Sequence, residues 1–295
     1  MMENIRGWGS YENLPADRTL VMGILNVTPD SFSDGGQHYG VEDAVAHARQ
    51  MIADGADIID VGGESTRPGS VRITAEEEQR RILPVIRELA KMGAVMSVDT
   101  LNPETARASI EAGAHIINDV SGMSLRDDMI AVAADLQIPY ILMHARGDSN
   151  TMDSEAMYED TVSEICEELT TLRQRLLDGG VKPENIIIDP GLGFAKAGDQ
   201  DWELLAGIDR LKELGHPVLI AGSRKRFVAT LLDAEDDRRA QSLGHHRSPA
   251  NRDGATTTIS TISAQQGAWA VRVHNVQPTA DAIAVVETLR RVAEK

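Results

Sequence analysis

Eight short apolar runs that each end on a polar or charged residue constrain the fold of this 295-residue chain more than any other feature. The terminal residues are Asn26, Asp60, Asp99, Asn118, His144, Asp189, Ser223 and His274. Parallel barrel strands are buried on both faces and therefore read as continuous Val, Ile and Leu runs. In such a barrel the groups that do chemistry stand where the strands end. The pattern predicts an α/β fold, a single (β/α)8 barrel with its active site at the C-terminal ends of the strands.

The predicted strands alternate with segments of helical periodicity. Strands are expected at 19–25, 57–60, 94–99, 115–119, 139–144, 185–189, 217–223 and 269–274. Helical spacing of apolar residues is found over 41–54, 75–92, 103–112, 126–136, 155–178, 200–214, 254–267 and 278–293. This alternation predicts parallel pairing with right-handed crossovers. One barrel can occupy a chain of this length, and no linker divides the series.

Two polar segments fall outside the barrel pattern. Residues 1–18 are interpreted as an N-terminal arm, and the barrel domain is expected over 19–295. Residues 233–253 are highly charged and show no apolar periodicity, which predicts an irregular insert in the seventh strand-helix unit. His245 and His246 in this insert lack nearby acidic residues at ligand spacing, so no metal site is assigned to them.

The composition excludes several classes of partner. The chain has 46 acidic against 29 basic residues, and its net charge of −17 repels nucleic acid and anionic membranes. Cys166 is its one cysteine, which rules out a disulfide framework and favours a reducing compartment. No apolar stretch reaches about 18 residues, and the N-terminus does not read as a secretion signal. We expect a cytoplasmic protein without nucleic-acid or membrane partners.

Arg272 and His274 of the last predicted strand are two residues apart, so both side chains are expected to face the barrel mouth. A buried arginine and histidine require an anion or a carboxylate as partner. Arg272 could pair with a barrel glutamate, for which Glu64 is available. The shared face of Arg272 and His274 in a net-negative chain favours an anion site instead.

Eight motifs resemble, in order and spacing, the signatures of the dihydropteroate synthase family. They are MGILNVTPDSFSDGG, DVGGESTRPG, SVDT, INDVSG, LMHARGD, IDPGLGFAK, GSRKRF and RVH, and they cover the chain from about residue 20 to its end. The resemblance implies a pterin-binding TIM barrel and a transferase of folate biosynthesis. Such an enzyme condenses 6-hydroxymethyl-7,8-dihydropterin diphosphate with 4-aminobenzoate to give 7,8-dihydropteroate and pyrophosphate. It also implies Mg2+ as cofactor, inhibition by sulfonamides, and a homodimer.

The resemblance assigns roles to matched positions. For the pterin ring they are Asp99, Asn118, Met143, Asp189, Phe194 and Lys225. For the diphosphate they are Asn26, Arg272 and His274, with Asn26 also giving an oxygen to the metal. For 4-aminobenzoate they are Thr66, Arg67, Pro68 and Ser223. Phe32 and Asp34 match loop residues that close over the reacting carbon, and they join Arg272, His274 and Lys225 as expected catalytic residues.

The residue types agree with these roles. Asp99, Asn118 and Asp189 end three different strands, and their oxygens and amide can accept from and donate to the flat edge of a pterin. The sequence offers no Ser/His/Asp or Cys/His nucleophile arrangement. It therefore favours dissociative loss of pyrophosphate, stabilised by Arg272, His274 and Mg2+, followed by attack of the arylamine.

Some positions have a plainer interpretation. Asp99, Asn118 and Asp189 could simply cap the helices that follow, because Asp and Asn are preferred N-cap residues. Arg226, and with it Arg224, is expected to be a surface charge beside an inward-pointing Lys225. Cys166 lies on a helix without a neighbouring histidine and is expected to have no role.

The chain departs from the family pattern at a few positions. Asn275 follows RVH where the family usually has Asp, which removes a negative charge beside the anion site. Ala195 stands where Gly is common, and Gln200 and Asp201 replace a frequent His-Asn pair. These changes do not touch the residues matched to the pocket.

Two other functions stay open on the sequence. A methyltetrahydrofolate-binding methyltransferase on the same barrel would read a pterin with similar residues. It has no need of Arg67, Lys225, Arg272 and His274 around a diphosphate, and this chain has all four. A non-catalytic paralogue is expected to have lost the STRPG or SRK motif, and this chain keeps both.

Overall fold

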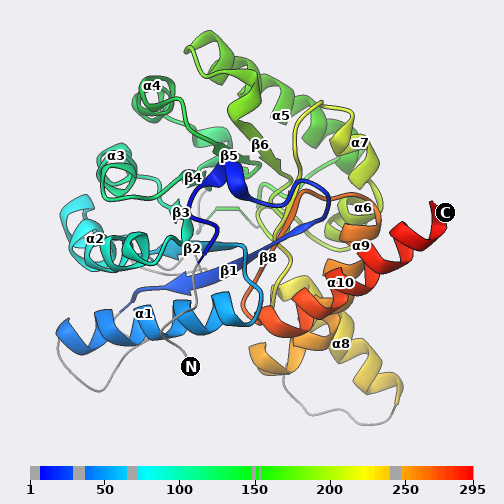
Figure 1. Ribbon diagram of the computed structural model, residues 1–295. Coiled ribbons are helices and arrows are strands. Elements are labelled where there is room, and N and C mark those ends of the chain that lie inside the picture. The colour runs from blue at the N-terminus through cyan, green and yellow to red at the C-terminus, as the bar shows by residue number, and fades with distance from the viewer. Residues whose placement is uncertain are drawn as a thin grey trace.

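The computed structural model describes residues 7–28, 37–64, 72–147, 151–152, 154–239 and 247–294, and of residues 37–39 it describes only the backbone. Within these ranges, eight parallel strands form a nearly closed barrel inside a ring of helices (Figure 1). The strands are β1 (Leu20–Asn26), β2 (Ile58–Gly62), β3 (Val95–Asp99), β4 (Ile116–Asp119), β5 (Tyr140–Met143), β6 (Ile186–Asp189), β7 (Leu219–Ile220) and β8 (Ala270–Val273).

The strand order β6-β5-β4-β3-β2-β1-β8-β7 leaves β6 and β7 at the two edges of the sheet. In the described part of the chain these edges meet through one isolated bridge, between Ile188 and Val218. There the Ile188 N–H donates to the Pro217 carbonyl at 2.8 Å. The parallel pairing and strand order confirm the predicted barrel.

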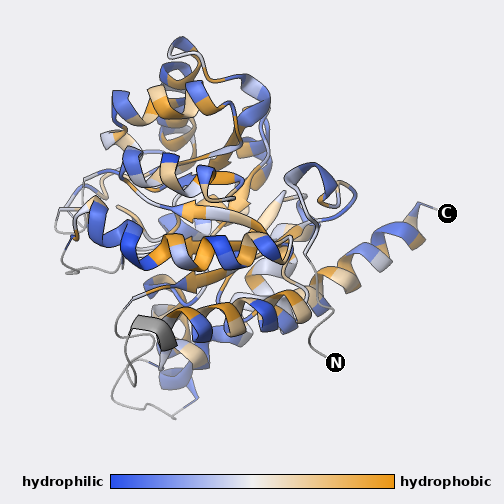
Figure 2. Cartoon of the chain, turned by 60° about the vertical axis from the view of Figure 1, so that its left-hand side comes forward, coloured by the Kyte–Doolittle hydropathy of each residue, from blue (hydrophilic) through white to orange (hydrophobic). Residues whose placement is uncertain are grey.

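The helices form the outer layer and turn their apolar faces toward the strands (Figure 2). They are α1 (Gln37–Ala53), α2 (Ala75–Lys91), α3 (Pro103–Glu111), α4 (Asp127–Leu136), α5 (Thr161–Asp178), α6 (Gln200–Ala206), α7 (Ile208–Lys212), α8 (Arg226–Arg238), α9 (Asp253–Gln265) and α10 (Val276–Ala293). Short 3-10 turns are found at Tyr11–Asn13, Gly122–Ser124, Pro183–Asn185 and Pro249–Arg252. None of the helices described here is both long and apolar enough to cross a membrane.

Two helix boundaries differ from the sequence prediction for local reasons. The helix predicted from residue 155 begins at Thr161, because the Asp160 carboxylate caps it by accepting the Ser163 N–H at 3.1 Å. The helix predicted over 200–214 is divided at Gly207, whose N–H closes α6 onto the carbonyls of Glu203 and Leu204.

The prediction of an irregular insert over 233–253 is wrong at both of its ends. α8 continues to Arg238, and Pro249–Arg252 form a 3-10 turn directly before α9. Charged side chains stabilise this end of α8 without an apolar stripe. Glu235 pairs with Arg238 one turn later at 2.6 Å, and the Asp236 carboxylate accepts from Nε of Arg247 at 2.7 Å.

The described part of the N-terminal arm closes the end of the barrel that lies opposite the strand C-termini. The buried Asp57 carboxylate accepts from Trp8 Nε1 at 3.0 Å, from both Nη atoms of Arg18, and from the Val21 N–H at 2.9 Å. Tyr11 and Leu14 pack against the apolar cluster inside the barrel. The arm is therefore packed onto the barrel over residues 7–18.

Candidate active site at the C-terminal barrel mouth

The barrel interior changes from apolar to polar along β2, β3, β4, β6 and β8. Its lower layer consists of Leu20, Met22, Ile58, Val95, Ile116, Ile141, Ile187, Leu219 and Ala270. Side chains two positions further along a strand face the same interior, and there the residues include Asp60, Asn118, Asp189 and Arg272. The apolar layer seals the floor, so the polar side chains gather at the mouth, as predicted.

Strand register aligns the predicted residues across neighbouring strands. Asn26 pairs with Gly62, Gly62 with Asp99, and Asp99 with Asn118, so these positions lie at one level of β1 to β4. On the other side of the barrel, Met143 pairs with Asp189 at the ends of β5 and β6. The structure thus brings five of the predicted site residues to the same rim.

Arg272 lies between two buried carboxylates. Its Nε donates to Asp60 Oδ2 at 2.6 Å and its Nη2 to Asp99 Oδ2 at 2.8 Å. Asp60 also accepts from the Ser97 hydroxyl at 2.5 Å and from Nδ2 of Asn118 at 3.3 Å. Arg272 therefore has carboxylate partners, as one alternative foresaw, but Glu64 is not among them. Glu64 instead accepts the Ile73 N–H at 3.2 Å.

The charges of this network depend on one another. Burial raises the pKa of Asp99 to about 7, against the opposing effect of Arg272. Burial disfavours the charged form of Arg272, but Asp60 and Asp99 outweigh it and raise the arginine pKa. The guanidinium thus stays charged between its two carboxylate partners.

Asp189, Phe194 and Lys225 form the other side of the mouth. The Lys225 ammonium lies 4.6 Å from the centre of the Phe194 ring and donates to the Leu192 carbonyl. Burial lowers the pKa of Lys225 to about 8, whereas Asp189 beside it acts to raise that pKa. Asp189 is buried, which raises its pKa, and its Oδ1 accepts the Gly191 N–H at 2.7 Å. The inward orientation predicted for Lys225 is confirmed.

Ser223 and His274 are brought together at the end of β8. The Ser223 hydroxyl lies 3.0 Å from Nδ1 of His274 and accepts the His274 backbone N–H at 3.2 Å. The expectation that Arg224 is an ordinary surface charge is wrong. It makes a two-pronged ion pair with Asp253, at 2.6 and 2.7 Å, and Asn275 donates to the same carboxylate at 3.1 Å. The amide of Asn275 therefore stabilises Asp253, a bond that the usual Asp could not donate.

The capping interpretation fails for the three strand-end residues. The N-cap residues of α3, α4 and α6 are Asn102, Arg126 and Asp199. The other predicted residues lie outside the described part of the chain, namely Phe32, Asp34, Thr66, Arg67, Pro68, His245 and His246.

A buried polar chain beside the mouth was missed by sequence reasoning. His144 contacts Glu168 through Nε2 at 2.7 Å and the Lys196 ammonium through Nδ1 at 3.2 Å. Asp201, a position noted only as a family departure, is also buried and accepts the Gly193 N–H at 2.6 Å. The available signal was a lysine within a glycine-rich loop next to a histidine-terminated strand.

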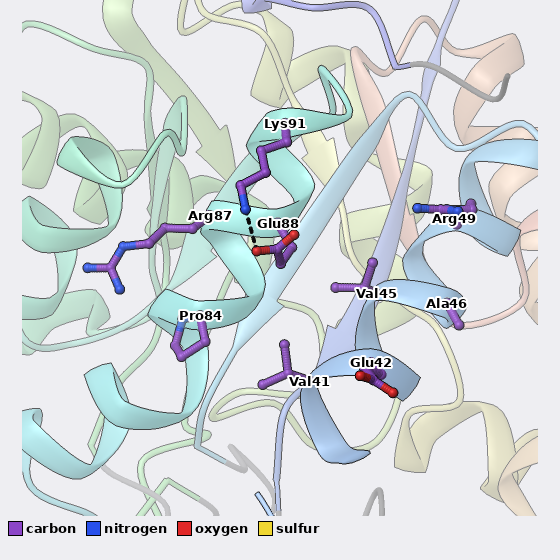
Figure 3. Close-up of a pocket in the computed structure, with 9 residues that line it drawn as sticks. All are labelled: Val41, Glu42, Val45, Ala46, Arg49, Pro84, Arg87, Glu88 and Lys91. Atoms are coloured by element: carbon purple, nitrogen blue, oxygen red, sulfur yellow. Dashed lines mark hydrogen bonds and ion pairs between the residues drawn. The ribbon is translucent and has the colours of Figure 1, made fainter. Parts of the chain in front are cut away.

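A separate groove lies on the outside of the barrel between α1 and α2 (Figure 3). It has a volume of about 760 Å3, and both helices line it with a mixture of apolar and charged side chains. None of the predicted site residues lines it. The barrel mouth, where the buried charged groups converge, remains the candidate active site.

Comparisons with known proteins agree with this site. Residues 22–274 match the family described as pterin binding enzyme. The dihydropteroate synthase of Mycobacterium leprae is 44% identical over 267 residues, which cover 90% of this chain and 92% of the relative. The Xanthomonas albilineans dihydropteroate synthase with 4-aminobenzoic acid is 41% identical, with a TM-score of 0.81 and coverage of 93% and 94%.

A third relative widens this comparison. The Yersinia pestis dihydropteroate synthase in complex with a sulfonamide drug is 36% identical, with a TM-score of 0.84 and coverage of 94% of this chain and 96% of that chain. Sequence identity, coverage and fold agree over nearly the whole chain. The chain therefore belongs to the family of pterin-binding enzymes, and within it to the dihydropteroate synthases.

Proposed function

We propose that this barrel condenses 6-hydroxymethyl-7,8-dihydropterin diphosphate with 4-aminobenzoate, releasing pyrophosphate and forming 7,8-dihydropteroate. One observation carries the proposal. Hydrogen-bonding groups suited to a pterin edge, the buried Asn118 and Asp189 and the partly buried Asp99, share one mouth with two partly buried cations, Arg272 and Lys225. A substrate that joins a flat polar heterocycle to a diphosphate matches this site, because the hydrogen-bonding groups suit the heterocycle and the cations suit the diphosphate.

Arg272 can serve the diphosphate without leaving its carboxylates. Nε and Nη2 are engaged by Asp60 and Asp99, and the described residues give Nη1 no hydrogen-bond partner. A guanidinium has five N–H donors in a rigid fork, so the two on Nη1 stay available to a phosphate oxygen. Asp60 and Asp99 would then orient the guanidinium rather than compete with the substrate.

The donor set at the mouth suits Mg2+ brought in with the substrate. Asn26, half-buried at the end of β1, carries an amide oxygen of the hard type that this ion prefers. The described residues contain no group of three His, Cys, Asp or Glu side chains that could hold an ion alone. Mg2+ usually keeps several waters and binds through few protein oxygens plus substrate phosphates. Bound there, it would neutralise charge on the leaving pyrophosphate.

The protein's own residues favour a dissociative substitution. Arg272 would stabilise the negative charge that develops on pyrophosphate, and His274 beside Ser223 would bind the same anion. Asp99, Asn118 and Asp189 would fix the ring while its methylene carbon carries positive charge. Phe194 would stack on the ring, Met143 would line its pocket, and Ser223 would meet the 4-aminobenzoate carboxylate. Thr66, Arg67 and Pro68 would contact that second substrate, and Phe32 and Asp34 would exclude water.

The test is pyrophosphate release from the purified protein given both substrates and Mg2+, with omission of 4-aminobenzoate as control. We expect release that depends on both substrates and is inhibited by a sulfonamide in competition with 4-aminobenzoate. Lys225→Met should abolish it, while Lys182→Met, an exposed lysine outside the mouth, should not. Absence of release, together with methyl transfer from methyltetrahydrofolate, would instead support the methyltransferase.

A homodimer is proposed to form through the C-terminal half of α10, which projects from the barrel (Figure 1). Val285, Leu289 and Val292 lie on one face of this helix and are 58%, 59% and 61% exposed. Three large apolar side chains in one exposed row are typical of an interface, and a second copy could bury them by a two-fold contact. Sedimentation should show a dimer that Leu289→Lys dissociates. A monomeric native chain would refute the proposal.

A cytoplasmic location is proposed on the single cysteine, since reducing compartments leave a lone thiol unpaired. Fractionation of cells that produce the protein would test it.

A further inference from the structure

The loop that follows β6 has a left-handed backbone at three positions, one of which is an alanine. Every second residue of this stretch has a left-handed backbone conformation. The φ angles are +68° at Gly191, +76° at Gly193 and +51° at Ala195. An added Cβ at Gly191 would lie 1.8 Å from the His144 carbonyl oxygen, so the loop is pressed against the end of β5. Left-handed backbone is strained for alanine and is kept only where surrounding contacts fix it.

Two pterin-pocket residues depend on this loop. Phe194 belongs to it, and Lys225 is held from it, because the Lys225 ammonium donates to the Leu192 carbonyl and lies over the Phe194 ring. A small shift of the loop would therefore move an aromatic face and a cation at once. Both would lose their alignment with a bound pterin.

Three side chains that lie outside the pocket make hydrogen bonds to the backbone of the loop. The Lys196 ammonium donates to the Phe194 carbonyl at 2.7 Å. Asp201 accepts the Gly193 N–H at 2.6 Å, and the Tyr158 hydroxyl donates to the Ala195 carbonyl at 3.0 Å. Of these three side chains, only Lys196 is itself part of the loop, and it is 4% exposed.

Lys196 is held by a chain of fixed groups that leads to the surface. Burial acts to raise the pKa of Glu168, but hydrogen bonds from His144 and Arg146 outweigh it and hold that pKa at about 2. The ionised Glu168 therefore accepts from Nε2–H of His144, whose pKa burial lowers to about 4. Nδ1 of the neutral ring then carries a lone pair and accepts from Lys196 at 3.2 Å.

The hydrogen bonds that Lys196 makes to His144 and to the Phe194 carbonyl do not depend on its charge. Burial lowers the pKa of Lys196 to about 7, so ammonium and amine are both accessible forms. An amine still has two N–H donors, which is the number that His144 and Phe194 require. What the loop needs from this side chain is its length and its donors.

We infer that Lys196 is a positioning residue of the pterin pocket, which fixes the 190–197 loop through His144 and the Phe194 carbonyl and so aligns Phe194 and Lys225. The inference rests on the proposed function, because it concerns the same pocket. It predicts a selective effect on the pterin substrate, whereas a merely structural buried lysine would affect stability and leave substrate affinity alone.

The test compares Lys196→Met, which keeps most of the side-chain length and removes the donors, with Lys182→Met as an exposed control. We expect Lys196→Met to raise KM for the pterin diphosphate tenfold or more. KM for 4-aminobenzoate should change less than twofold, as should both constants of Lys182→Met. Equal pterin KM in the two variants, or equal rises for both substrates, would overturn the inference.

A second variant covers the case in which Lys196→Met does not fold. Tyr158→Phe deletes one hydroxyl from a half-buried side chain and releases the Ala195 carbonyl. It should raise the pterin KM two- to fivefold, and an unchanged value would contradict the premise of the inference, that contacts on the loop backbone align Phe194 and Lys225. Calorimetric binding of 6-hydroxymethylpterin to each folded variant tests alignment without turnover. If the native chain released no pyrophosphate, the proposed function would fail, while this binding comparison would still decide the role of Lys196.

Discussion

Arg272 allows a quantitative test, because its removal leaves two carboxylates without a cation inside the barrel. We consider Arg272→Met, which keeps most of the side-chain volume. The Arg272 side chain is 17% exposed, and its partners Asp60 and Asp99 are 0% and 10% exposed. Breaking a buried ion pair by removing one partner costs about 3–5 kcal/mol, whereas exposed pairs contribute about 0–1 kcal/mol. For a chain of this size, the buried value corresponds to a fall of roughly 5–8 °C in the unfolding midpoint.

The loss should depend on pH in a defined direction. Arg272 opposes the effect of burial on Asp99, so its removal raises the Asp99 pKa further above its present value of about 7. An acid whose folded pKa exceeds its unfolded pKa stabilises the fold at low pH and loses that contribution as pH rises through the folded pKa. The stability gap between native chain and variant should therefore stay constant between pH 5 and 6.5 and widen as the pH rises past about 7 toward pH 8.

Thermal unfolding of the native chain and the variant at pH 5, 6.5 and 8 measures this gap. Arg80→Met is the control, since the Arg80–Glu77 pair has a similar length of 2.7 Å but is exposed, and it should shift the midpoint by about 2 °C or less. A pH-independent gap, or equal shifts for both variants, would refute the argument that buried carboxylates depend on Arg272. Arg272→Lys should recover part of the loss.

Three further outcomes are expected. Asp189→Ala should weaken pterin binding by about 2 kcal/mol, because a charged acceptor is lost and ring donors stay unpaired; equal affinity by calorimetry would contradict this. A sulfonamide should bind measurably only with Mg2+ and pyrophosphate present, if the bound anion selects closed loops; equal titrations with and without them would mean a preformed site. Ala195→Gly should change the unfolding free energy by less than about 1 kcal/mol, because relief of strain offsets the added chain entropy. The buried helical control Ala133→Gly should cost about 1–2 kcal/mol, and similar losses in both would show Ala195 to be unstrained.

The barrel could be predicted because its strands are short, buried on both faces and separated by helices of clear periodicity. Asp99, Asn118 and Asp189 were recognisable since a strand end is a local sequence feature that the fold places at one rim. The partners of Arg272 were not recognisable. Asp60 and Asp99 lie 212 and 173 residues away in sequence, and several acidic residues at strand ends could have reached the same guanidinium.

Two parts of the structure that are stabilised by pairs of polar side chains could not be predicted from the spacing of apolar residues. The end of α8 consists mostly of charged residues and is stabilised by pairs such as Asp236 with Arg247, so a search for apolar spacing finds no helix there. The support of the pterin loop escaped for a similar reason. His144 and Lys196 are joined to Glu168, a residue on the outer surface helix α5 whose inward orientation cannot be read from its polarity.

The junction between β6 and β7 has so little backbone pairing that a bound ligand could contribute to holding the barrel together. Every other neighbouring pair of strands is joined by a regular ladder, but here the described backbone contributes one isolated bridge, and β7 is only two residues long. Asp189 ends β6 and Lys225 follows β7, so the two residues lie on opposite sides of the junction between these strands. A pterin that contacts both residues would link β6 to β7 across the junction of the sheet with the fewest backbone hydrogen bonds. Binding of the pterin would then make the whole barrel more rigid.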